Sequence, residues 1–155
     1  MGLFNRKKKE EFISPMKGKL LSMEQVPDPA FAQKIMGDGV AIELTGKEVV
    51  APFSGTVAAA FPTGHAFGIR TGDGMEILLH IGIDTVNLEG RGFEVAVRAG
   101  DTVKQGDLLV KVDTDYIKSQ GKSVVSPIIF TSGEQVKQLK TGMVDTGEEH
   151  IIKIM

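Results

Sequence analysis

The sequence predicts an all-β fold, either a sandwich or a barrel of antiparallel strands with few short helices. Glycine is frequent, at 19 of 155 residues, and aromatic residues are scarce, at 6%. Short apolar segments alternate with turns rich in glycine, aspartate and serine from residue 12 onward. Strands that are interrupted this often favour a sandwich or barrel over a helical bundle.

Each predicted strand is a short run of mainly apolar residues between turn residues. The predicted strands are residues 40–44, 48–51, 56–60, 66–70, 76–83, 94–96, 108–112, 123–129 and 151–154. Two segments, 28–35 and 113–120, have the pattern of short helical turns. In a weak internal repeat, residues 14–20 resemble residues 51–57, and residues 126–129 resemble the first residues of both segments. This repeat indicates that part of the fold is duplicated.

Composition argues against several classes of function. The formal net charge is −2 and the pI about 5.9, so the chain lacks the basic surface of a nucleic-acid binder. It has no cysteine, which removes disulfides, thiolate nucleophiles and iron–sulfur clusters. Its apolar runs fall well short of the ~18 residues of a membrane span, and the N-terminus lacks the apolar core of a secretion signal. We therefore expect a cytoplasmic protein.

Residues 1–11 form a predicted flexible, basic tail ahead of a single domain over residues 12–155. Its charge comes mainly from residues 6–9, and Leu3-Phe4 is its one small apolar patch. Two interpretations stay open: a solvated terminus, or weak peripheral contact with an anionic membrane surface. The contact would be weak because a single apolar pair buries little area.

Two of the three histidines, His65 and His80, lie on neighbouring predicted strands joined by a glycine-rich turn. A turn at residues 72–73 or 71–74 pairs Arg70 with Met75 and places His65 directly opposite His80. A turn at residues 73–74 places His65 opposite Gly82, diagonal to His80. In either register we expect the two imidazole rings to lie together.

Alternation along the second strand assigns its two faces. We expect a core face of Ile77, Leu79, Ile81 and Ile83. Leu78 and His80 then share the opposite face with His65, Phe67 and Ile69. Three interpretations of the histidines stay open: incidental residues, a metal-binding pair that lacks further ligands, or a nucleophilic imidazole beside a second imidazole that holds an anion.

Four blocks of sequence are distinctive: VPD at residues 26–28 with FAQKIMGDGVAI at 31–42, VAP at 50–52 with GT at 55–56, TGHAF at 63–67, and LHIGIDTV at 79–86. Through these blocks the chain resembles the glucose-class enzyme IIA of the bacterial sugar phosphotransferase system over about residues 12–155. The opening Met1-Gly2-Leu3-Phe4 resembles the stand-alone form of that protein.

The resemblance implies an antiparallel β-sandwich or barrel of two facing sheets and a phosphoryl relay. By similarity, His80 is phosphorylated by the histidine-containing phosphocarrier protein (HPr) and passes the group to a cysteine on the IIB domain of a glucose-type permease. His65 would hold the phosphoryl oxygens, oriented by the Thr63 hydroxyl. Such a relay requires no cofactor, because phosphoryl transfer depends mainly on positioning and on stabilised oxygens.

The resemblance also implies a surface that docks onto partners. Two carboxylates, Asp28 and Asp84, would flank the histidines and meet a basic partner. The expected apolar rim consists of Phe31, Met36, Phe61, Leu78 and Val86. Relatives also bind sugar transporters and kinases such as glycerol kinase according to phosphorylation state, in contacts where His65 and His80 would share zinc with a partner's carboxylate. We expect a monomer, and His150 matches no motif.

Other classes fit the residues less well. Residues 51–57 and 97–107 resemble biotinyl and lipoyl carrier domains, but the lysine motifs those domains modify, Ala-Met-Lys-Met and Asp-Lys-Ala, do not occur. A zinc peptidase of similar architecture needs a His-x-His pair, which this chain lacks. A regulatory binding module remains compatible with the relay.

Overall fold

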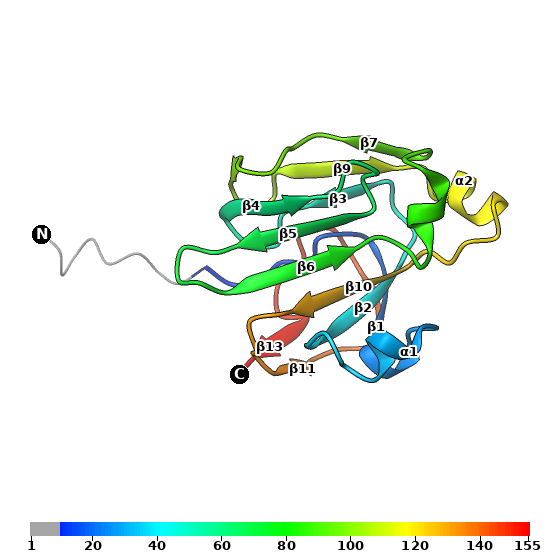
Figure 1. The fold of residues 1–155 in the computed structure, drawn as a ribbon. Helices are drawn as coiled ribbons and strands as arrows, with labels where there is room; N and C mark the ends of the chain where they lie inside the picture. The colour runs from blue at the N-terminus through cyan, green and yellow to red at the C-terminus, as the bar shows by residue number, and fades with distance from the viewer. Residues whose placement is uncertain (1–9) are drawn as a thin grey trace, which may run out of the picture.

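A computed structural model describes residues 10–155, which form three antiparallel sheets (Figure 1). The largest has eight strands in the order β12-β1-β2-β10-β6-β5-β4-β8. These are β12 (Gly142–Val144), β1 (Gly18–Ser22), β2 (Asp38–Leu44), β10 (Val125–Phe130), β6 (Glu76–His80), β5 (Ala66–Arg70), β4 (Gly55–Ala60) and β8 (Thr102–Val103). A second sheet contains β3 (Glu48–Val50), β9 (Leu108–Val112) and β7 (Phe93–Val95), and a third contains β11 (Val136–Gln138) and β13 (Ile152–Ile154).

Helical structure in residues 10–155 is limited to four short pieces. They are the 3₁₀ turns η1 (Met23–Gln25) and η2 (Thr85–Leu88) and the helices α1 (Pro29–Ala32) and α2 (Thr114–Ser119). The carboxylate of Asp28 caps α1 by accepting a hydrogen bond from the Ala30 amide at 2.9 Å. The prediction of an all-β fold is confirmed. Within this range, no helix has the length and apolar character needed to cross a bilayer.

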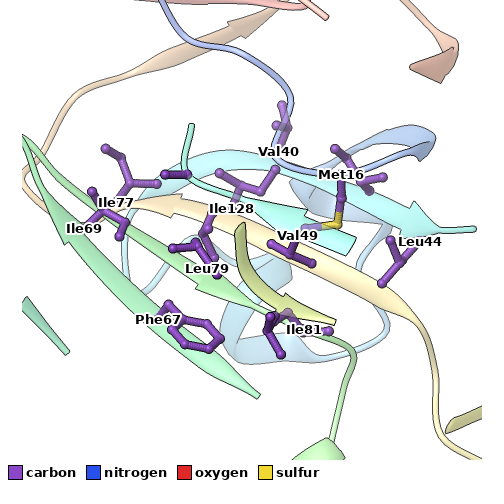
Figure 2. Close-up of a cluster of buried hydrophobic side chains, with 14 of the residues drawn as sticks. Met16, Val40, Leu44, Val49, Phe67, Ile69, Ile77, Leu79, Ile81 and Ile128 are labelled. Carbon is purple, nitrogen blue, oxygen red and sulfur yellow. The ribbon is translucent and has the colours of Figure 1, made fainter. Parts of the chain in front are cut away.

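The main core lies between the eight-stranded and three-stranded sheets. It takes alternate side chains from most of its strands, because successive residues of a strand point to opposite faces. Figure 2 shows part of it, including Phe67 from β5, Leu79 from β6, Ile128 from β10 and Val49 from β3, all without exposed surface. Burial of this apolar area holds the two sheets together as a sandwich.

A second, smaller apolar cluster covers the other face of the large sheet. It receives the residues that alternate with those of the main core, such as Ala41 of β2 and Ile129 of β10. Its outer layer comes from η1, α1 and the turns beside them, through Met23, Val26 and Phe31. The histidine site lies at one edge of this cluster.

The predicted strands at 66–70 and 108–112 match β5 and β9, and the other predicted strands overlap observed strands with small shifts at their ends. The predicted strand 76–83 is too long, because β6 ends at His80. Strands β1, β8, β11 and β12 were not predicted from the sequence. These four strands are short or rich in polar and glycine residues, and they are held by partners distant in the chain.

The β5–β6 hairpin has a different register from either predicted one. Ala66 pairs with His80 and Arg70 with Glu76, so the predicted partners of His65 and Arg70 are wrong. Because a shift of one residue moves every side chain to the opposite face, Phe67 and Ile69 lie in the main core instead of beside His80.

The length of the hairpin loop explains this difference. The Thr71 amide donates to the Met75 carbonyl at 2.9 Å, and the Met75 amide donates to Thr71 Oγ1 at 3.1 Å. Gly72, Asp73 and Gly74 remain at the tip, with Gly74 in the left-handed region at φ +91°. Such three-residue loops are a common alternative to the two- and four-residue turns that were predicted.

The predicted tail at 1–11 lies mostly outside the described residues. Its last two residues are held by the domain. The Glu10 carboxylate accepts hydrogen bonds from the amide and hydroxyl of Ser54 at 2.6 and 2.7 Å. Glu11 lies 3.4 Å from Nδ1 of His150.

Candidate functional site

His80 is the last residue of β6, where the strand leaves the sheet. Ile77 and Leu79 point into the main core, whereas Leu78 and His80 point to the opposite face. Leu78 packs against the smaller apolar cluster, and the half-buried ring of His80 contacts Phe31 of the same cluster with the ring centroids 5.2 Å apart. The strand and the α1 segment together position this imidazole.

The protonation of the His80 ring follows from its hydrogen bond. Nδ1 lies 2.7 Å from the carbonyl oxygen of Gly82, which accepts hydrogen bonds and cannot donate them. Nδ1 therefore carries the hydrogen. In the neutral ring this leaves the lone pair on Nε2, the nitrogen that is free to act as a nucleophile.

His65 precedes β5 and is buried, with 6% of its surface exposed. Its carbonyl accepts a hydrogen bond from the Ile81 amide at 2.7 Å, which extends the β5–β6 ladder by one step. Gly64 before it has φ +75°, and a Cβ added there would lie 2.8 Å from Cβ of Phe93. A left-handed, crowded glycine thus sets the path of the chain into His65.

The two imidazole rings meet although their residues are not paired in the sheet. Their centroids are 5.3 Å apart and their planes are inclined by 75°. The Thr63 hydroxyl lies 2.5 Å from Nδ1 of His65. Phe61 contacts the His65 ring edge-on, with centroids 5.2 Å apart. The sequence correctly predicted that the rings lie together, on the basis of a wrong register.

Burial governs the charge state of both rings. It lowers the pKa of His65 below the usual 6.5, and the neighbouring His80 lowers it further. Burial also lowers the pKa of His80, although the Gly82 carbonyl and the carboxylates of Asp28 and Asp84 oppose the shift. Both rings are therefore neutral near pH 7.

An exposed apolar rim lies on the segments around the histidines. Three of the five predicted rim residues are exposed: Met36 at 42%, Phe61 at 45% and Val86 at 48%. Phe31 is buried and contacts the His80 ring, and Leu78 is half-buried against the smaller apolar cluster, so neither is an exposed rim residue.

Two further apolar residues on these segments are exposed and were not predicted from the sequence: Ile35 at 71% and Val95 at 40%. Val95 lies close to Gly64, because a Cβ added to that glycine would be 2.9 Å from Val95 Cγ2. Ile35 follows α1, within the segment that supplies Phe31. Periodicity could not identify Ile35 as exposed, because α1 ends at Ala32 and the chain beyond it is irregular.

The carboxylates have different local roles. Asp28 caps α1, as described above. Asp84 is exposed and adopts a left-handed conformation, with φ +60°, at the start of η2. Both act electrostatically on His80. The predicted flanking carboxylates are therefore close enough to influence the ring.

Possible metal ligands occur in one group of three within residues 10–155, and that group excludes the paired histidines. It consists of Glu11, Glu149 and His150, all exposed, with ligand atoms within 4.8 Å of one another. His65 and His80 therefore form at most two ligands of a metal site, and a closed zinc site needs about four.

The histidines also lie outside the hollow of about 740 Å³ beside β3, β7 and β9. That hollow is lined mainly by lysine, acidic and glycine residues. The histidine site is therefore distinct from this hollow.

Comparison with known proteins agrees with this fold. The glucose permease IIA from Mycoplasma capricolum superimposes with a TM-score of 0.87 and 42% sequence identity, covering 94% of this chain and 96% of that one. The structure shares the β-sandwich architecture of that protein. The predicted fold class, an antiparallel β-sandwich, is confirmed both by the secondary structure and by this superposition.

The family follows from the sequence comparisons. The family described as the phosphoenolpyruvate-dependent sugar phosphotransferase system, EIIA 1, matches residues 10–136, and this chain belongs to it. Glucose-specific EIIA components from Staphylococcus epidermidis and Staphylococcus aureus are 44% and 45% identical, over 93% and 91% of this chain and 89% and 87% of theirs. A glucose-specific EIICBA component from Streptococcus pneumoniae is 50% identical over 84% of this chain, which spans 18% of that longer protein.

Proposed function

We propose that this protein is a phosphoryl relay of the sugar phosphotransferase system. Nε2 of His80 accepts the phosphoryl group from phosphohistidine on HPr and passes it to a cysteine on the IIB domain of a glucose-type permease. In the first step the donor's N–P bond breaks as the Nε2–P bond forms. In the second, the Nε2–P bond breaks as an S–P bond forms. The observation that supports this function best is the neutral His80 ring, held through Nδ1, beside a second imidazole.

The environment of His80 suits a nucleophile. A neutral imidazole has a lone pair for attack on phosphorus, and burial lowers the pKa so that the neutral form persists at physiological pH. The Gly82 carbonyl keeps the proton on Nδ1 and orients the ring. The ring is thus arranged before the donor binds.

His65 suits the role of phosphoryl-binding donor. When the Thr63 hydroxyl donates to Nδ1 of His65, the hydrogen of the neutral ring is on Nε2, where it serves as a donor to a phosphoryl oxygen. A neutral donor stabilises the oxygens less than a lysine or arginine would. This matters for a relay, because an over-stabilised phosphohistidine would not release its phosphoryl group.

The two carboxylates favour release of the phosphoryl group and recognition of a basic partner. Asp28 and Asp84 stabilise positive charge near His80 and so disfavour accumulation of phosphoryl negative charge. They also complement a basic surface on a partner. The exposed apolar residues Met36, Phe61 and Val86 supply contact area beside them. HPr and the IIB domain would therefore dock in turn on one surface.

The acceptor is inferred from the names of longer relatives. Two glucose-specific EIICBA components, from Streptococcus pneumoniae and Staphylococcus carnosus, each contain a region like this chain. An EIIA region fused to EIIB and EIIC regions is expected to exchange phosphoryl groups with the B region. A relay fed by phosphoenolpyruvate operates in the cytoplasm, and no cofactor takes part.

A phosphorylation-dependent regulatory role would use the same surface. The histidine pair offers two zinc ligands and lacks a third within residues 10–155. A carboxylate of a bound transporter or kinase would therefore be needed to complete a zinc site. Phosphorylation of His80 would remove one ligand and place a dianion in the interface.

Intact-mass analysis tests the relay. The protein is incubated with phosphoenolpyruvate, enzyme I and HPr, and compared with His80→Ala, His65→Ala and His150→Ala. We expect an acid-labile gain of one phosphoryl group in wild type that is lost in His80→Ala and retained in His65→Ala. His150→Ala is the matched control, because this exposed histidine lies beside Glu11 and Glu149.

A second stage measures transfer onward to a IIB domain. His65→Ala is expected to slow this transfer while His80 still becomes phosphorylated. If wild type gains no mass while HPr is visibly phosphorylated, the relay function is wrong. If His80→Ala is still phosphorylated, the assignment of the nucleophile is wrong.

A further inference from the structure

A buried hydroxyl lies behind the loop that orients His80. Ser126, on β10, has no exposed surface. Its Oγ accepts a hydrogen bond from the Gly82 amide at 3.1 Å and donates one to the Val124 carbonyl at 2.9 Å. Donor and acceptor capacities of this hydroxyl are both used, so its orientation is defined by the protein.

Gly82 is thereby held at both of its polar groups. Its amide donates to Ser126 and its carbonyl accepts from Nδ1 of His80 at 2.7 Å. The sheet does not hold this residue, because β6 ends at His80. Gly82 is instead left-handed, with φ +73°. A glycine in this conformation has few intrinsic restraints, so its hydrogen bonds decide where its peptide groups point.

Other hydrogen bonds hold the residues next to Gly82, but the Gly82 amide is held by Ser126. The Ile83 amide donates to the Ser123 carbonyl at 3.1 Å, and the Thr85 hydroxyl donates to the Ile81 carbonyl at 2.5 Å. These bonds hold the residues on either side of Gly82. Ser126 is the side chain that accepts a hydrogen bond from the Gly82 amide.

We propose that Ser126 is a positioning residue of the relay, whose hydroxyl holds Gly82 so that the Gly82 carbonyl keeps the His80 hydrogen on Nδ1. Nε2 is then the nitrogen that attacks phosphorus, and the Nδ1 hydrogen stays in place while the N–P bonds exchange. The catalytic consequence rests on the proposed phosphoryl relay. The orientation of the ring does not depend on it.

The internal repeat supplies a matched control. Ser14 and Ser126 each precede a proline, and both are fully buried. The Ser14 hydroxyl donates to the Met16 carbonyl at 2.7 Å, as that of Ser126 donates to Val124. Only Ser126 also contacts the loop that orients His80. Ser14→Ala therefore removes a comparable buried hydroxyl without disturbing Gly82.

The test compares Ser126→Ala, Ser126→Thr and Ser14→Ala with wild type. Long-range ¹H–¹⁵N spectra of the unphosphorylated protein report which nitrogen of His80 carries the hydrogen. Rapid-quench measurements report the rate of phosphorylation by phospho-HPr. We expect wild type and Ser126→Thr to show the Nδ1–H tautomer and similar rates. Ser126→Ala should show a mixture of tautomers and a rate about tenfold lower, since small displacements of a reacting group have effects of this order.

Ser14→Ala is expected to lose stability while keeping the wild-type tautomer and rate, which separates positioning from general destabilisation. If Ser126→Ala keeps both the wild-type tautomer and rate, the proposal is overturned. Should that variant fail to fold, Ser126→Cys replaces it, because the thiol leaves no cavity and is a weaker acceptor. Wild-type behaviour there likewise overturns the proposal. If wild-type protein accepts no phosphoryl group, the relay function fails, while the tautomer measurement still decides the role of Ser126.

Discussion

The imidazole rings of His65 and His80 meet edge to face at 5.3 Å, although the sheet pairs His80 with Ala66. His65 lies just outside β5, after a left-handed glycine, so its side chain is not held to the alternation of the strand. His80 points away from the main core at the last position of β6. The contact therefore forms where both strands end.

Acid should destabilise the protein through these two histidines. Because burial lowers both pKa values below 6.5, the unfolded chain binds protons that the folded chain does not. The free energy of unfolding therefore falls as pH decreases from 6.5 to the folded-state pKa values, and recovers as pH rises. NMR titration of the ring protons should give both pKa values below 6.5, and values above 6.5 would contradict this account. His65→Asn should show a smaller loss of thermal stability between pH 7 and pH 5 than wild type.

The two phenylalanines that contact the histidines should differ in their effects. Phe31 is buried, so Phe31→Ala should lower the free energy of unfolding by about 3 kcal/mol. Phe61 is 45% exposed, and Phe61→Ala should change it by less than about 1 kcal/mol. Urea denaturation measures both. Equal losses of the free energy of unfolding in the two variants would show that Phe31 is not a supporting core residue and Phe61 a surface residue.

Gly82 should tolerate no side chain. A Cβ there would lie 2.5 Å from Thr85 Cγ2 and 2.6 Å from the Ser123 carbonyl, at φ +73°. We expect Gly82→Ala to cost about 3 kcal/mol and to slow phosphorylation of His80, because the Gly82 carbonyl must move. Gly147→Ala is the control: it has φ +86° with nothing within 4 Å, so it should cost only about 1 kcal/mol of backbone strain. If Gly82→Ala loses no more free energy of unfolding than Gly147→Ala, the surroundings of Gly82 are not as crowded as the structure indicates.

The exposed rim should affect docking more than stability. Val86→Glu or Ile35→Glu should raise the apparent KM for phospho-HPr several-fold, since each places a charge in an apolar contact, while thermal stability stays near wild type. Met143→Glu changes an equally exposed residue on β12, which β1, β2 and β10 separate from β6. It should leave KM unchanged. A similar increase in KM for Met143→Glu would argue against a localised docking surface.

Sequence patterns predicted much of this molecule. Period-two alternation identified Ile77, Leu79 and Ile81 as core residues, and the structure buries all three. Runs of apolar residues between turns identified most strands. The strands that were missed, such as β8 and β11, are two or three residues long and contain polar side chains. Their pairing depends on distant partners, which local periodicity cannot reveal.

The sequence by itself determined the all-β class, the chemical types available for function and the presence of two histidines in one hairpin. These properties depend on composition and on neighbours along the chain. Only the tertiary structure decided the hairpin register, because the hydrogen bonds of Thr71 give the loop an odd length. It also decided what surrounds His80. Phe31 and Ser126 come from distant segments, brought to the site by the packing of α1 and the position of β10 beside β6.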